Sequence, residues 1–252
     1  MMRGLANRQG LAMSGLSAAG TSSEFGEARR LATNPLWALE RRLLMWMAER
    51  MPAAVNSDHL TLLALAAMGL TGLSYAGARF TRSGLWLAIA GLAINWFGDS
   101  LDGTLARVRR QERPRYGFYV DHVVDCLGVA CLMAGLGASS YMSPLVAAGV
   151  LVAYFMLSIE IYLATYCLAV FRMSFWGVGP TELRLLLIVG TLALRSDPHV
   201  VMFGQTHRLF DVGGIVAIAS IATVLMTTIA KNVRLLHRAE PLTDAVSWKG
   251  GR

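Results

Sequence analysis

The stretch "GDSLDGTLARVRRQERPRYGFYVDHVVDCLG", residues 98–128, lies between two long apolar runs. It carries four aspartates at the adjoining ends of two predicted membrane helices: Asp99, Asp102, Asp121 and Asp125. A carboxylate at membrane depth is costly and normally faces the protein interior or a watery cavity. The stretch therefore predicts an acidic site inside a helical membrane protein.

The composition of the whole chain supports a membrane protein. The 252 residues are 55% hydrophobic and only 15% charged, whereas a soluble domain carries about 25% charged residues. The net charge is +7, and basic residues in a polytopic protein more often set its topology than bind nucleic acid. We therefore expect membrane lipid and phosphorylated substrates as partners, and no nucleic acid.

Apolar length predicts six transmembrane helices, near residues 59–78, 84–107, 117–138, 144–170, 181–195 and 211–231. The fifth is short, and Pro180 would lie in its first turn. "RSDPH" at 195–199 ends this span, and the weakly apolar "VVMFG" follows it. The predicted fold is all-α and integral to the membrane. A domain of residues 35–238 lies between a mobile N-terminal tail, 1–34, and a C-terminal tail, 239–252.

The segment before the first span, residues 35–51, alternates apolar and charged residues at helical spacing. One side of such a helix would carry Trp37, Leu43, Leu44 and Trp46, with Glu40, Arg41 and Arg50 elsewhere. This pattern predicts an amphipathic helix lying at the membrane interface. A helix that packs on the protein is the alternative.

The distribution of basic residues predicts the orientation. With a cytoplasmic N-terminus and six spans, 19 of the 23 Lys and Arg residues fall on the inside. Both termini are then cytoplasmic, and the four aspartates lie at the cytoplasmic face. We expect a bacterial-type inner membrane.

Helical geometry arranges the aspartates in two pairs. At 100° per residue, Asp99 and Asp102 lie 60° apart on one face, and Asp121 and Asp125 share a face of the next helix. Four carboxylates side by side need compensating cations, and oxygen-only ligands favour Mg²⁺ or Mn²⁺. Two divalent cations would balance four charges, and two metals commonly assist displacement at phosphorus.

An ion-paired helix interface is the structural alternative for the same residues. In that arrangement Arg107, Arg109 and Arg110 would neutralise the aspartates.

The stretch reads D-x2-D-G-x2-A-R-x9-G-x3-D-x3-D and resembles the signature of the CDP-alcohol phosphotransferases, also called CDP-alcohol phosphatidyltransferases. These are membrane enzymes of phospholipid synthesis. Every fixed position is present: Asp99, Asp102, Gly103, Ala106, Arg107, Gly117, Asp121 and Asp125.

The resemblance implies a mechanism. A CDP-linked donor places its pyrophosphate on two metals, an alcohol acceptor attacks the phosphorus not attached to cytidine, and CMP leaves. By the resemblance, Asp99, Asp102 and Asp121 are metal ligands. Asp125 is the general base and lies close to the second metal. Gly103, Ala106, Arg107 and Gly117 adjoin the nucleotide.

Two further segments bear on the substrates. Family members often have a Pro-Asn pair leading into a Thr before the first span, and "VNSDHLT" makes Asn56 and Thr61 nucleotide-contact candidates. Asp58 is a candidate helix N-cap. After the fourth span, "GPTE" resembles the amino-alcohol phosphotransferases of this superfamily, so Glu182 could meet a cationic head group. Arg172 and Arg184 could instead grip an acceptor phosphate.

The leading hypothesis is transfer of a phosphatidyl group from CDP-diacylglycerol to a small polar alcohol. A CDP-choline- or CDP-ethanolamine-type enzyme acting on diacylglycerol is the alternative within the family. A divalent-cation or proton transporter is the alternative of another class. Gly- and Ala-rich faces of the spans are compatible with a homodimer.

Overall fold

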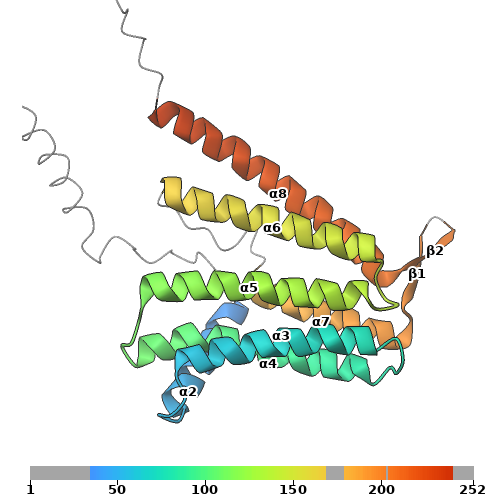
Figure 1. The fold of residues 1–252 in the computed structure, drawn as a ribbon, viewed down its shortest axis with the longest axis horizontal. Coiled ribbons are helices and arrows are strands. Elements are labelled where there is room, and N and C mark those ends of the chain that lie inside the picture. Colours follow the sequence, from blue (N-terminus) through green and yellow to red (C-terminus); the bar gives the residue numbers. More distant parts are fainter. Residues whose placement is uncertain (1–34, 169–178, 203, 241–252) are drawn as a thin grey trace, which may run out of the picture.

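The computed structural model describes residues 35–168, 179–202 and 204–240. This part of the chain forms helices and one short hairpin (Figure 1). In chain order they are α2 (Pro35–Arg50), α3 (Ser57–Gly77), α4 (Gly84–Val108), α5 (Pro114–Gly137), α6 (Pro144–Leu168), α7 (Pro180–Ser196), β1 (His199–Met202), β2 (Gln205–Arg208) and α8 (Leu209–Ala239). The predicted tail 1–34, nearly all of the tail 239–252, and Arg172 lie outside the described residues.

Five of these helices are long and apolar enough to cross a membrane: α3, α4, α5, α6 and α8. The predicted all-α membrane fold is therefore confirmed. Helix α7 has 17 residues, which is near the lower limit for a span, so the count of six spans stays a prediction. Helix α8 continues well past the predicted end of the last span, with Arg234 and Arg238 in its final turns.

A two-stranded antiparallel hairpin connects α7 to α8, where no strand was predicted. His199 pairs with Arg208, and Met202 pairs with Gln205. Gly204 lies at the turn with φ of 76°, a left-handed conformation that glycine adopts without steric cost. Each strand has only four residues, too few for alternation to stand out in a sequence.

Helices α3, α4 and α5 pack most closely. A Cβ on Gly72 of α3 would lie 2.2 Å from the Cys131 carbonyl oxygen of α5, and one on Gly135 would lie 2.0 Å from the Gly72 carbonyl oxygen. On the other side of α3, a Cβ on Gly98 of α4 would lie 2.6 Å from the Leu60 carbonyl oxygen. Small residues thus bring the backbone of α3 into contact with both helices that carry the aspartates.

Helix α2 lies across α3 and α4 and buries Leu44 and Ala48 in a small apolar cluster with Leu60, Leu101 and Leu105. Leu43 and Trp46, predicted to share a side with Leu44, are exposed in the isolated chain. Both features agree with a helix that packs on the protein through one stripe and presents a second apolar stripe outward. Its position at a membrane interface stays a prediction.

Helices α6 and α8 pack against each other, and α6 also contacts α5 (Figure 1). Their outer surfaces carry large exposed apolar side chains, including Val152, Met156, Ile159, Val216 and Met226. Such a continuous apolar surface suits contact with lipid acyl chains. The four aspartates of the opening stretch lie elsewhere, on α4 and α5.

We predict that Gly72→Ala lowers the thermal stability of the protein because its Cβ would press on the α5 backbone. Overpacking of this kind costs about 1–3 kcal/mol. Thermal unfolding in detergent checks this. Gly69→Ala is the matched control on the same helix, since a Cβ there meets nothing within 4 Å. Equal stability of the two variants would contradict the close contact of α3 with α5.

Candidate active site

Three of the four aspartates converge between α4 and α5. Asp99, Asp121 and Asp125 each offer one carboxylate oxygen, and these atoms lie within 4.8 Å of one another. All three residues are half-buried. Oxygen-only ligands at such spacing are the donor set that hard divalent cations prefer. The cluster can therefore hold a metal ion.

Asp102 is held by α3. Its Oδ2 accepts a hydrogen bond from the Thr61 hydroxyl at 2.6 Å, and its Oδ1 accepts from the backbone N–H of Gly103 at 2.5 Å. The Ser57 hydroxyl also donates to the Asp102 carbonyl oxygen, at 2.9 Å. The structure thus leaves Asp102 outside the group of three, although Asp99 and Asp121 are near enough to affect it electrostatically. Its predicted role as a metal ligand stays a prediction.

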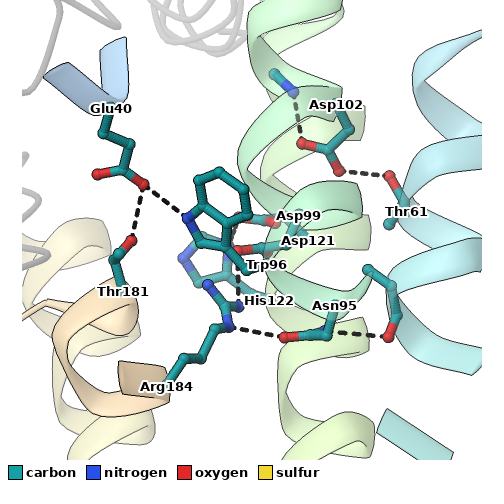
Figure 2. A network of polar contacts seen from close by, with 12 residues as sticks. Glu40, Thr61, Asn95, Trp96, Asp99, Asp102, Asp121, His122, Thr181 and Arg184 are labelled. Atoms are coloured by element: carbon teal, nitrogen blue, oxygen red, sulfur yellow. Dashed lines mark hydrogen bonds and ion pairs between the residues drawn. The ribbon is translucent and has the colours of Figure 1, made fainter. Parts of the chain in front are cut away.

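Arg184 of α7 reaches the cluster from the other side (Figure 2). Its Nη2 donates to Asp99 Oδ2 at 2.7 Å, and its Nε donates to Asn95 Oδ1 at 2.7 Å. Asn95 in turn donates to the Ala64 carbonyl oxygen at 3.0 Å. The remaining nitrogen, Nη1, is buried and has no hydrogen-bond partner among the residues that the structure describes. Arg184 is thus a fixed cation with one nitrogen, and its two N–H donors, that no described residue occupies.

The arginines that follow Asp102 are engaged elsewhere. Arg107 donates to the Thr104 hydroxyl at 3.2 Å. The Arg109 guanidinium donates to the carbonyl oxygens of Met51 at 3.0 Å and Pro52 at 2.8 Å, and also to that of Val55. These contacts give no support to the alternative in which Arg107 and Arg109 neutralise the aspartates.

Arg109 and Arg113 instead tie the α4–α5 loop to the start of α3. Arg113 pairs with Asp58 at 2.5 Å, and hydrogen bonding to Asp58 raises the pKa of the Arg113 guanidinium. Asp58 was a candidate N-cap, but the N-cap of α3 is Asn56, whose side chain accepts from the His59 N–H at 2.9 Å. A nucleotide contact by Asn56 stays a prediction.

The predicted nucleotide-binding glycines face open space. A Cβ on Gly117 would meet nothing within 4 Å, and one on Gly103 would meet only the Arg107 guanidinium, at 3.7 Å. Ala106 is half-buried on the same helix as Gly103. Because Gly103 and Gly117 have no side chain, a ligand has room to approach the backbone there. Their contact with a nucleotide stays a prediction.

The two remaining acceptor-binding candidates have different outcomes. Glu182 accepts a hydrogen bond from the backbone N–H of Gly179 at 2.9 Å and so caps its own helix. Arg172 lies outside the described residues. Of the two candidates that the structure describes, Arg184 is the one placed against the aspartates.

Two contacts around the site were not predicted from the sequence. Asn95 orients Arg184, and Thr61 holds Asp102, a role distinct from the predicted nucleotide contact. Asn95 is a polar residue inside an apolar run, one helical turn before Asp99. This pattern could have indicated that Asn95 takes part in the site.

The flank of α5 next to the aspartates adjoins α6. An apolar cavity of about 410 Å³ is lined by Phe118, Tyr119, His122, Val123, Cys126, Leu127 and Tyr162. His122 stacks on Phe118 with ring centroids 4.1 Å apart, and its Nδ1 lies 2.6 Å from the Phe118 carbonyl oxygen. This imidazole therefore forms part of the α5–α6 packing beside Asp121.

The fold and the acidic cluster define a polytopic membrane protein with a carboxylate site suited to a divalent cation. The family model described as CDP-alcohol phosphatidyltransferase matches residues 55–230, and the chain belongs to this family. No curated protein matches the chain. The family is one of transferases of substituted phosphate groups in phospholipid synthesis, which confirms the resemblance in the opening stretch.

We predict that Asp99→Asn and Asp121→Asn each weaken binding of Mn²⁺ at least about tenfold, because each removes one anionic ligand of the cluster. Electron paramagnetic resonance of Mn²⁺ titrated into the purified protein measures this. Asp197→Asn is the control, since this exposed residue lies beyond the C-terminal end of α7. Unchanged Mn²⁺ affinity in both cluster variants would rule out the cluster as the metal site.

Thr61→Val should lower turnover about tenfold or more because it removes the hydroxyl that holds Asp102, and residues that orient metal ligands commonly matter on this scale. Thr61→Ser keeps the hydroxyl and should retain most of the activity. Initial rates over a range of Mg²⁺ concentrations check this. Equal rates for the two variants would show that the contact with Asp102 is dispensable.

Proposed function

We propose that the protein transfers a phosphatidyl group from CDP-diacylglycerol to a small polar alcohol and releases CMP. The observation that carries the proposal is the convergence of Asp99, Asp121 and Asp125 with the fixed guanidinium of Arg184. A carboxylate cluster beside a buried cation suits a ligand that brings both metal ions and phosphate groups. Family membership supports the CDP-linked donor and the alcohol acceptor.

In this proposal Asp99, Asp102, Asp121 and Asp125 hold two divalent cations, Mg²⁺ or Mn²⁺. When bound, such cations polarise phosphoryl oxygens and stabilise the charge that develops during displacement at phosphorus. The oxygen-only donor set and its spacing within 4.8 Å support this assignment. Asp102 joins the set from its position against Thr61.

The remaining roles follow the chemistry of the transfer. Asp125 accepts the proton of the acceptor hydroxyl, the new bond forms between that oxygen and the lipid-side phosphorus, and the bond to the departing CMP oxygen breaks. The nucleotide half of the donor lies along α4 and the ends of its neighbours, against Gly103, Ala106, Arg107, Gly117 and Asn56. The open space at Gly103 and Gly117 supports this placement.

The contacts of α7 favour an anionic over a cationic partner at this end of the site. The Glu182 carboxylate is bonded to the Gly179 N–H of its own helix, whereas Arg184 has a buried nitrogen without a partner among the described residues. We infer that Arg184 binds a phosphate oxygen of a substrate. This supports CDP-diacylglycerol with a polar, phosphate-bearing alcohol over an amino-alcohol donor.

The sequence "GPTE", residues 179–182, keeps the amino-alcohol enzyme as the second candidate. The transporter alternative has no support from the family, whose members are transferases. We further propose that the site opens to the cytoplasm of a bacterial-type inner membrane. The charge asymmetry, with 19 of 23 basic residues on that side, supports this orientation.

A screen of CDP-linked donors against alcohol acceptors, read out as CMP release, tests the function. Purified full-length protein in lipid nanodiscs with Mg²⁺ should release CMP from CDP-diacylglycerol. Asp125→Asn should reduce turnover at least about 100-fold, as expected for a general base, while thermal unfolding stays cooperative. Release of CMP only from CDP-choline or CDP-ethanolamine with diacylglycerol would establish the second candidate instead.

A further inference from the structure

Glu40 of the N-terminal helix α2 joins two other helices at the level of the site. Its Oε1 accepts a hydrogen bond from the Trp96 indole N–H of α4 at 2.9 Å and one from the Thr181 hydroxyl of α7 at 2.9 Å (Figure 2). Glu40 precedes residues 55–230, which match the family model. This carboxylate was predicted to lie away from the apolar side of α2, and the structure directs it into the protein.

The two partners of Glu40 adjoin the residues that face the cluster. Trp96 follows Asn95 directly and precedes Asp99 by three positions on α4. Thr181 precedes Arg184 by three positions, so the two side chains lie about 60° apart on α7. Glu40 therefore links α4 and α7 one helical turn from the point where Arg184 links the same two helices.

The first turns of α7 depend on these polar links. Farther along, Leu187 and Ile188 pack against the apolar core, and Thr191 bonds to the Tyr75 hydroxyl at 2.5 Å. Before Leu187, the side-chain contacts that join α7 to other helices include Thr181 with Glu40 and Arg184 with Asn95 and Asp99. Removing Glu40 would therefore remove one of the described polar links between this part of α7 and its neighbours.

We propose that Glu40 is a positioning residue that fixes the first turn of α7 and thereby keeps the Arg184 guanidinium at the aspartates. The proposal rests on the proposed function in taking Arg184 as a substrate-phosphate contact. Glu40 itself touches no aspartate in the described contacts, so its effect on the reaction passes through α7. Helix α2 thus completes the site although it supplies no ligand.

Four variants and one matched control distinguish a role of Glu40 in positioning α7 from a role that only stabilises α2. Glu40→Ala removes both hydrogen bonds, while Glu40→Gln keeps an oxygen that can accept them. Arg184→Ala removes the group that is positioned, and Glu40→Ala/Arg184→Ala combines both changes. Glu49→Ala is the matched control because Glu49 is an exposed carboxylate on the same helix.

Kinetics in nanodiscs give the first readout. Arg184→Ala should raise the KM of the substrate whose phosphate Arg184 contacts. Glu40→Ala should raise the same KM about tenfold, because a small misplacement of a binding group has effects of this size or larger. Glu40→Gln and Glu49→Ala should stay within about twofold of the wild type. The double variant should match Arg184→Ala, because coupled residues are non-additive. Two results would overturn the proposal. One is a KM of the double variant about tenfold higher than that of Arg184→Ala. The other is an unchanged KM in Glu40→Ala.

Amide hydrogen exchange gives a readout that needs no activity. Peptides covering residues 183–190 should exchange faster in Glu40→Ala than in the wild type, with Glu40→Gln and Glu49→Ala unchanged. Identical exchange in Glu40→Ala and the wild type would show that Glu40 does not hold α7. Wild-type protein that releases no CMP from any donor would refute the proposed function alone, and the exchange comparison would still test the positioning of α7.

Discussion

The cost of half-burying several carboxylates between two helices is the constraint on which the site depends. Asp99, Asp121 and Asp125 lie within 4.8 Å of one another on two adjacent helices, an arrangement that repulsion and desolvation would oppose without cations. Among the described contacts, Arg184 is the cation that the protein supplies to the cluster, whereas Arg109 donates to backbone carbonyls. A divalent cation would neutralise the negative charge that remains. The repulsion between carboxylates that opposes folding is therefore also what favours binding of the cation.

The scaffold meets this constraint by giving each helix a separate task. Helices α4 and α5 carry the aspartates, α3 holds Asp102 through Thr61, and α7 delivers Arg184. The contacts of Arg109 and Arg113 fasten the loop between the two acidic helices to the start of α3. These contacts orient the carboxylates of Asp99 and Asp102 before any substrate arrives, and such preorganisation favours catalysis.

Much of this could be predicted from the sequence, because apolar length and helical spacing are local properties. The main helices and the facing of Asp99 toward Asp121 and Asp125 follow from them. The contacts of Arg184 with Asp99 and of Glu40 with Thr181 join residues 85 and 141 positions apart, and such pairings depend on how helices pack. The β1–β2 hairpin was missed because strands of four residues leave little periodicity. Asp58 was the predicted N-cap by residue type, but Asn56 caps α3 and Asp58 pairs with Arg113, a partner 55 positions away that residue type alone does not reveal.

Helix α3 carries none of the three clustered aspartates, yet its backbone touches both helices that carry them through Gly72, Gly98 and Gly135. It therefore acts as a spacer of fixed thickness between the two acidic helices. A side chain added at these contacts would change the separation of the carboxylates without altering any of them. Such a change, far from the reacting atoms, would alter the cation requirement: the enzyme would need a higher concentration of divalent cation to reach the same rate.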